Sequence, residues 1–327
     1  MPLFRTILGE CLQEIAQLAN DSLHAICTDP PYGLVEFSAE EVSKLRAGKG
    51  GVWRIPPNWD GCERRPLPRF SVLTQEQKKG IEDFFYLWAQ ALHPKLVPGG
   101  HFLVAGNPTL QMYVQSAFVR AGLENRATIL RVYHGFRGGD RPKNAEAEFP
   151  EVCVSPRSNY EPWMLFRKPI SEKTVAQNLR KWGTGGLRML AGGRPLPDLI
   201  PSFKTPERER EIADHPSLKP QHLLRVLVRS LLPMGTGHVL DPFMGSGSTL
   251  AACEALKIES TGFEVDREYF ELSQRAIPQL AALYPTFDGS NLEPIDVPTP
   301  EVELSGQLTI LETMDELKLG PARGRAG

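Results

Sequence analysis

Hydrophobic and polar positions alternate along the chain in two ways, as short apolar runs and as longer stretches with helical spacing. The short runs predict strands at residues 3–8, 23–27, 101–105, 125–133, 161–168, 238–240 and 260–264. The helical spacing predicts helices at residues 11–19, 81–96, 108–122, 221–232, 249–256 and 266–284. Strands that alternate with helices indicate a mostly parallel sheet covered by helices. We therefore expect an α/β fold with a Rossmann-like sheet.

Three segments interrupt this alternation. Residues 33–80 mix Gly, Pro and charged residues, which predicts either a lid over the site or a tolerated surface insertion. Residues 171–214 contain few long apolar runs and read as an inserted recognition region or a plain linker. The chain then divides into a first half at 1–170, the inserted region at 171–214, a second half at 215–285 and a loosely held tail at 286–327.

A glycine-rich stretch, DPFMGSGST at residues 241–249, follows the predicted strand at 238–240. Gly245 and Gly247 can take positive φ, and the helix that follows would direct its N-terminal amides at the loop. Such loops serve NAD, FAD and S-adenosylmethionine alike, and a purely structural turn stays an alternative. Glu264 ends the next strand, where an acidic residue can bind ribose hydroxyls, and Asp241 could hold a cationic amino group.

A second motif, TDPPY at residues 28–32, follows the predicted strand at 23–27. An aromatic exocyclic amine is a poor nucleophile, and two hydrogen bonds accepted from its protons would localise its lone pair. Asp29 and the carbonyl of Pro30 are candidate acceptors, since a proline has a C=O and no N–H. Pro31 stiffens the loop, and Tyr32 offers a flat face for an extruded base. The alternative is a rigid turn without chemistry.

The two motifs together resemble those of the amino-group DNA methyltransferases. TDPPY resembles their catalytic motif, and DPFMGSGST resembles their S-adenosylmethionine motif. The catalytic motif comes first, which resembles the β, circularly permuted order of that family. Residues 160–168 (YEPWMLFRK), 173–176 (KTVA) and 182–185 (WGTG) resemble stretches of phage and prophage adenine-N6 modification enzymes. Gly9-Glu10-Cys11 is similar to a Gly-Asp-Cys element with Glu10 in place of Asp. Residues 215–220 (HPSLKP) resemble a His-Pro-Thr-Gln-Lys-Pro element, with two departures at Ser217 and Leu218.

This resemblance implies a set of site residues. Lys219 would approach the cofactor's carboxylate, although an ordinary surface charge is an alternative. The implied catalytic residues are Asp29, Pro30, Pro31 and Tyr32. The implied cofactor contacts are Glu10, Thr28, Asp29, Lys219, Asp241, Phe243, Gly245, Ser246, Gly247, Thr249, Glu264 and Val265.

Charge gives weaker information about partners. The net charge of −2 makes no case for nucleic acid, but residues 126–212 hold 16 Lys and Arg against 10 Asp and Glu. A phosphate-binding face would need this excess, and a solvated polar surface could also show it. The candidate DNA contacts are Arg137, Arg141, Lys143, Arg180, Lys181, Arg188, Arg194 and Lys204.

Cysteine and hydropathy patterns bound the compartment. The five cysteines are scattered without metal-ligand spacing, and Cys27 and Cys253 lie in apolar runs, as reduced core thiols do. No apolar run reaches the length of a membrane span, and the N-terminus lacks a signal-peptide core. We expect a cytoplasmic protein without a metal site.

The sequence thus predicts an enzyme that methylates the N6 amine of adenine in double-stranded DNA by base flipping and direct attack. In the family, Asp at the first position of this motif is more often seen with adenine, and Ser with cytosine N4. Because this is a tendency and not a rule, cytosine N4 is the alternative target. A Rossmann oxidoreductase or a non-catalytic nucleic-acid-binding module are alternatives of other classes. A cognate restriction endonuclease and a homodimer are further partners that the resemblance leaves open.

Overall fold

The structure is a computed structural model, and it describes residues 2–31, 74–132, 142, 144–145, 147–156, 158–215 and 217–292. Tyr32, most of the predicted 33–80 lid, Arg137, Arg141, Lys143 and nearly all of the tail at 286–327 lie outside these residues. The described residues belong to one unit, which spans Met1–Ile295.

An eight-stranded sheet forms the centre of this unit, with strand order β1-β8-β7-β2-β3-β5-β4-β6. All neighbouring pairs are parallel except those that involve β5, which runs antiparallel to β3 and β4. The strands are β1 (Phe4–Leu8), β2 (Leu23–Thr28), β3 (Leu96–Ala105), β4 (Glu124–Val132), β5 (Tyr160–Arg167), β6 (Leu199–Pro201), β7 (His238–Asp241) and β8 (Glu259–Glu264). Because β1, β2, β7 and β8 are parallel, they end at one edge of the sheet, which we call the motif edge.

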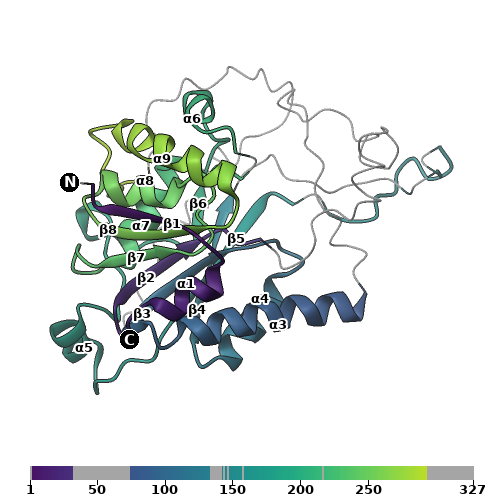
Figure 1. Ribbon diagram of the computed structural model, residues 1–327. Coiled ribbons are helices and arrows are strands. Elements are labelled where there is room, and N and C mark those ends of the chain that lie inside the picture. The colour runs from purple at the N-terminus through teal and green to yellow at the C-terminus, as the bar shows by residue number, and fades with distance from the viewer. Residues whose placement is uncertain are drawn as a thin grey trace, which may run out of the picture. The chain divides into compact units, whose positions relative to one another are not determined.

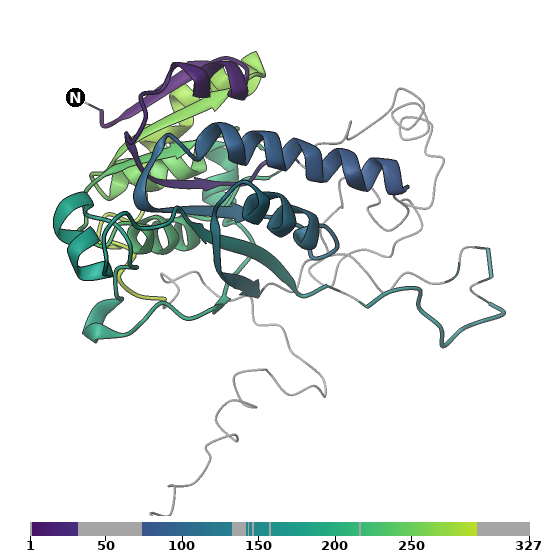
Figure 2. The same ribbon diagram turned by 90° about the horizontal axis from the view of Figure 1, so that it is seen from below.

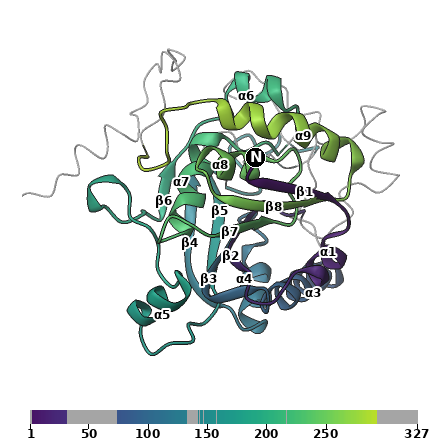
Figure 3. The ribbon, with the colours of Figure 1, turned by 60° about the vertical axis from the view of Figure 1, so that its left-hand side comes forward.

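Helices cover both faces of this sheet, as Figure 3 shows: α1, α3 and α4 lie on one face, and α7, α8 and α9 on the other. The helices are α1 (Cys11–Gln17), α3 (Gln75–Leu92), α4 (Gln111–Arg120), α5 (Val175–Trp182), α6 (Glu207–Ile212), α7 (Gln221–Leu231), α8 (Ser248–Ala255) and α9 (Arg267–Ala282). Among the described residues, no helix is long and apolar enough to cross a membrane.

The long helix α3 shows how the sequence makes this core. Its N-terminus is fixed by a capping box, in which the Thr74 hydroxyl accepts from the Gln77 N–H and the Gln77 side chain accepts from the Thr74 N–H. Ile81, Phe85 and Trp88 recur at helical spacing and are fully buried against the sheet. Figure 2 shows α3 and α4 side by side on this face.

The structure changes the bounds of one predicted helix. The helix predicted at residues 81–96 is α3, which begins at Gln75 and ends at Leu92, and β3 begins at Leu96. Residues 171–214 supply α5, β6 and α6 to the unit, and β6 pairs with β4 at the end of the sheet. Their part in DNA recognition stays a prediction.

Candidate active site at the motif edge

The two motifs meet because the strands that carry them are neighbours. Ala25 and Ile26 of β2 pair with Val239 and Leu240 of β7. At the ends of these strands the Thr28 hydroxyl donates a hydrogen bond of 2.7 Å to Asp241 Oδ1, which also accepts from the Phe243 N–H at 3.1 Å. This bond joins the TDPP turn to the glycine-rich stretch across more than two hundred residues of sequence.

Asp29 lies at the end of β2 and pairs with a lysine from the loop before α7. Its Oδ2 lies 2.5 Å from Lys219 Nζ, and the two side chains are 18% and 12% exposed. Lys219 has a second carboxylate partner, Glu161 Oε1 at 3.1 Å, at the start of β5. Glu161 in turn pairs with Arg131 at the end of β4, at 3.2 Å. Four mostly buried side chains of alternating charge therefore follow one another along the motif edge, in the order Asp29, Lys219, Glu161 and Arg131.

Burial and charge act in opposite directions on these groups. Burial raises the pKa of Asp29, and the Lys219 ammonium opposes the rise. Burial alone would raise the pKa of Glu161, but the Lys219 and Arg131 cations outweigh it and lower this pKa. Burial also raises the pKa of the neighbouring Asp241 to about 6, against hydrogen bonds from Thr28 and Thr249. The pKa values of the carboxylates at this site are thus shifted in different directions, which is typical of functional sites.

The glycine-rich stretch turns from β7 into α8 beside the end of β8. The Gly245 N–H donates to Glu264 Oε2 at 2.9 Å, and Gly245 has a φ of +52°. A Cβ on Gly245 would lie 2.9 Å from His215 Nε2. The imidazole of His215 can therefore lie this close to the backbone only because residue 245 is glycine. Glu264 has moderate exposure, and the next residue, Val265, is 71% exposed.

Gly247 serves packing, and this can be measured. It has a φ of +86°, and a Cβ there would lie 2.4 Å from Ile277 Cγ1 of α9. We expect Gly247→Ala to lower the free energy of unfolding by about 2–4 kcal/mol, from left-handed strain plus overpacking. Gly192→Ala is the matched control, because Gly192 has a φ of +70° and open space around its Cβ position. It should cost only about 1 kcal/mol; equal losses in urea unfolding would show that Ile277 is not the cause.

Comparison with known proteins places the chain in a family. The family described as DNA methylase, which groups N6 and N4 methyltransferases, matches residues 23–275. The chain belongs to this family. The predicted methyltransferase class and the use of S-adenosylmethionine are thereby confirmed, and the oxidoreductase alternative loses its support.

Individual relatives of this DNA methylase are distant but nearly coextensive with it. The type II methyltransferase M.HindIII of Haemophilus influenzae is 24% identical over 81% of this chain and 92% of its own. The type II methyltransferase M.MjaI of Methanocaldococcus jannaschii is 22% identical over 80% of this chain and 87% of its own.

Solved structures show the same fold. M1.HpyAVI in complex with S-adenosylmethionine has a TM-score of 0.52 and 16% identity, and covers 84% of this chain and 98% of its own. The PvuII DNA methyltransferase, which is cytosine-N4-specific, also has a TM-score of 0.52 and 16% identity, and covers 86% of this chain and 93% of its own.

The residues of the DNA methylase fit the cofactor's functional groups. A pocket at the glycine-rich stretch is lined by Asp29, Trp163, His215, Ser217, Lys219, Asp241, Phe243, Met244, Gly245, Ser246, Ser248 and Thr249. Its carboxylates suit an amino group, the Glu264 carboxylate suits vicinal hydroxyls, and the exposed Val265 suits an aromatic ring. The pocket has a volume of about 30 Å³, room for a water molecule, so in this structure it can enclose only a small part of a bound cofactor.

The structure brings most of the predicted cofactor residues together but uses several of them internally. Thr28 is fully buried and bonded to Asp241, and Ser246 is 2% exposed. Phe243 packs against Trp88, with ring centroids 5.2 Å apart. Glu10 caps α1, where its Oε2 accepts from the Gln13 N–H at 3.0 Å. Of the predicted cofactor residues, Val265 is exposed, at 71%.

The predicted DNA contacts are divided between the two edges of the sheet. Arg180 and Lys181 lie on α5, which packs by Asn178 against the Pro98 carbonyl near the start of β3, at the edge opposite the motif edge (Figure 1). The Arg188 N–H bonds to Ser230 near the end of α7, and Arg194 closes a turn with Leu190 before β6 begins. Lys204 lies just past the end of β6, at the motif edge. Its position favours it over the other four.

Sequence reasoning missed Glu161 and Arg131, the inner members of the charged chain. Glu161 lies near the start of a buried, mostly apolar strand, which is a signal for a buried ion pair, whereas β4 also holds Glu124, Asn125 and Arg126 and gives no such signal for Arg131. It also missed His215 as a site residue; this side chain lines the pocket and contacts Tyr269 edge to face, with ring centroids 4.4 Å apart.

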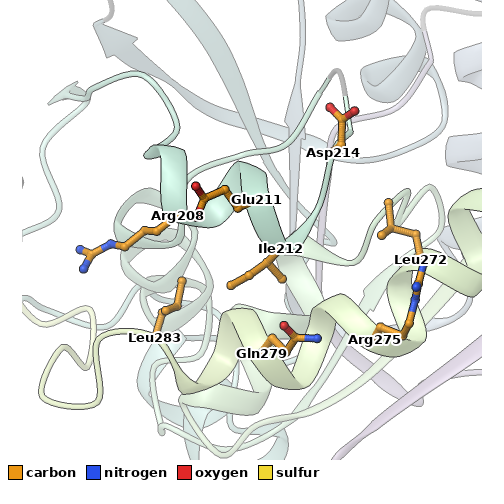
Figure 4. Close-up of a pocket in the computed structure, with 8 residues that line it drawn as sticks. All are labelled: Arg208, Glu211, Ile212, Asp214, Leu272, Arg275, Gln279 and Leu283. Carbon is orange, nitrogen blue, oxygen red and sulfur yellow. The ribbon is translucent and has the colours of Figure 1, made fainter.

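A larger cavity, of about 590 Å³, lies between α6 and α9 and contains no motif residue. Figure 4 shows its lining: Arg208, Glu211, Ile212, Asp214, Leu272, Arg275, Gln279 and Leu283. Its rim mixes both signs of charge, and we assign it no part in the chemistry. Among the described residues, no group of His, Cys, Asp or Glu could hold a metal ion.

Proposed function

We propose that this DNA methylase transfers the methyl group of S-adenosylmethionine to the exocyclic N6 amine of adenine in duplex DNA, with the base turned out of the helix. One observation supports the proposal most strongly. Asp29 ends β2 at the rim of the glycine-rich pocket, only partly exposed and paired with Lys219. A partly buried carboxylate beside a cofactor pocket is what activation of an amine needs.

Two residues of the protein would assist the reaction: Asp29 as the acceptor for the amine protons and Lys219 as the cation beside it. Asp29 accepts a hydrogen bond from the amine, and Lys219 keeps the partly buried carboxylate ionised before the base arrives. S-adenosylmethionine, when bound, supplies a sulfonium methyl carbon, to which the amine nitrogen forms a bond as the carbon–sulfur bond breaks. Asp29 receives the proton that the nitrogen then loses, and burial suits it to this because burial raises its pKa.

The order of the motifs supports the permuted class. The TDPP strand β2 precedes the glycine-rich strand β7 in the chain, although the two are neighbours in the sheet. The roles proposed for Glu264 and Val265 as cofactor contacts, and for Pro30, Pro31 and Tyr32 in the base pocket, rest on this class. Arg137, Arg141, Lys143 and Lys204 stay our proposed DNA contacts. A restriction endonuclease partner and a homodimer stay predictions from the resemblance.

Cytosine N4 is the second candidate base, because the PvuII enzyme that shares this fold is cytosine-N4-specific. A single experiment decides between them. The protein is incubated with methyl-labelled S-adenosylmethionine and, side by side, with duplex DNA, RNA and protein. Nucleosides from the labelled polymer are then identified by mass spectrometry. We expect N6-methyladenine from DNA alone. N4-methylcytosine would correct the base, and label in RNA or protein only would overturn the proposal.

A further inference from the structure

Glu161 holds a central place in the buried charges behind Asp29. One carboxylate oxygen, Oε1, contacts Lys219 at 3.1 Å. The other, Oε2, accepts from Arg131 at 3.2 Å and from the Trp163 indole N–H at 2.9 Å. Glu161 and Arg131 are direct cross-strand partners in the β4–β5 pair. Both side chains are less than a tenth exposed, at 8% and 7%.

Arg131, the last of these four charged residues, is held in place as well. The Arg131 guanidinium also donates to the Ser202 hydroxyl and to the Phe203 carbonyl, each at 3.0 Å, just past β6. A buried carboxylate with three donors cannot reorient without leaving a charge unpaired, which is costly in an interior. Among the described residues, Lys219 is the lysine that contacts both Asp29 and Glu161, so it lies between two carboxylates.

We propose that Glu161 is a positioning residue for the methyl transfer: it shares the Lys219 ammonium with Asp29 and so determines how much of the Asp29 carboxylate is left to accept the amine protons. This inference rests on the proposed function. With Glu161 ionised, Lys219 divides its hydrogen bonds between two acceptors. Without that second acceptor, Lys219 would pair with Asp29 alone and compete with the amine for it.

The charged groups around Asp29 shift its pKa in opposite directions, so the proposed sharing of Lys219 can be tested by changing pH. The charged groups that face it are Lys219 before α7, Glu161 of β5, Arg131 of β4 and Asp241 of β7. His215 lines the same pocket. Lys219 and Arg131 lower the pKa of Asp29, and Glu161 raises it. Removing the Glu161 charge should therefore lower this pKa, and removing the Arg131 charge should raise it.

The test measures single-turnover methyl transfer to DNA across pH. In Glu161→Gln we expect a rate lower by about tenfold and an acid limb moved down by about one pH unit. In Arg131→Gln the acid limb should move up instead. Loss of structure alone would not shift the two profiles in opposite directions, so shifts of the same sign would overturn the inference.

The same strand pair offers a matched control. Glu124 of β4 pairs with Arg167 of β5, its register partner at the edge opposite the motif edge, with Glu124 Oε2 2.6 Å from Arg167 Nη2. Glu124→Gln removes the same charge from the same two strands and should change neither the rate nor the profile. Equal rate losses in Glu124→Gln and Glu161→Gln would mean that Glu161 acts only by holding the strands together.

A double variant tests whether Glu161 acts through Lys219. In a Lys219→Met background, Glu161→Gln should lower the rate no further, since no ammonium is left to share. The same fold-loss in both backgrounds would overturn the inference. Carbon-13 titration of the Asp29 carboxyl in the ligand-free protein gives the same pKa order without any activity. If the protein methylates no DNA amine, the proposed function fails, while this titration still confirms or refutes the charge sharing.

Discussion

Replacing Asp29 by Asn should lower methyl transfer to DNA by about a thousandfold, with the affinity for S-adenosylmethionine changed by less than about threefold. The amide keeps the size of the side chain but cannot be the ionised acceptor that the amine requires. Its NH2 group would also face the Lys219 ammonium, which now lies 2.5 Å from Oδ2. Rates come from transfer of tritium from the cofactor, and affinities from titration calorimetry.

The other end of β2 provides the control. Asp21 precedes this strand and also pairs with a lysine, Lys168, at 2.9 Å, but at the edge opposite the motif edge. Asp21→Asn should leave both the rate and the affinity within about twofold of the original, since the Asp21 side chain is 43% exposed and lies far along β2 from the motifs. If Asp29→Asn weakened cofactor binding as much as it slowed transfer, Asp29 would be a cofactor ligand and not the acceptor for the amine.

The meeting of the two motifs could be predicted because it depends on rules that the sequence displays. Parallel strands bind ligands at their carboxyl ends, so a TDPP strand and a glycine-rich strand in one sheet present their motifs at one edge. The strand predicted at 23–27 and the one at 238–240 match β2 and β7 within a residue. For the two motifs to meet, these strands needed only to belong to the same parallel sheet.

The charged chain behind Asp29 could not be predicted, because it depends on strand register. Arg131 and Glu161 become neighbours only through the antiparallel β4–β5 pairing, and no local pattern gives the alignment of two strands. The same limit explains Lys219. Sequence resemblance placed it near the cofactor's carboxylate, whereas the structure gives it two carboxylates of the protein, Asp29 and Glu161.

The segment 171–214 shows a different limit. Its elements are short, such as the three-residue β6 and the six-residue α6, and neither has enough apolar periodicity to be recognised. An excess of Lys and Arg over a range of sequence also does not tell which edge of the sheet each side chain reaches. Arg180 and Lys204 were both predicted as DNA contacts, and the fold places them at opposite edges of the sheet.

A buried arginine of α7, Arg225, connects this helix to the C-terminal end of α9. Its side chain is 1% exposed. The guanidinium donates hydrogen bonds to five backbone carbonyls at and beyond the C-terminal end of α9: those of Leu280, Ala281, Leu283, Tyr284 and Phe287. Two of these carbonyls also accept a backbone N–H, Leu280 from Leu283 at 3.2 Å and Tyr284 from Phe287 at 3.0 Å, and the buried cation adds a donor to all five where the helix ends.

Arg225→Met should therefore lower the free energy of unfolding by about 3–5 kcal/mol, since methionine fills much of the volume but donates no hydrogen bond. A loss of this size corresponds to a Tm lower by roughly 6–12 °C in calorimetry. Arg229→Met, one helical turn later, is the control, because Arg229 donates to the single Met189 carbonyl at 2.7 Å. It should cost less than about 1.5 kcal/mol. Similar losses in both variants would show that the methylene stems, and not the carbonyl bonds, carry the effect.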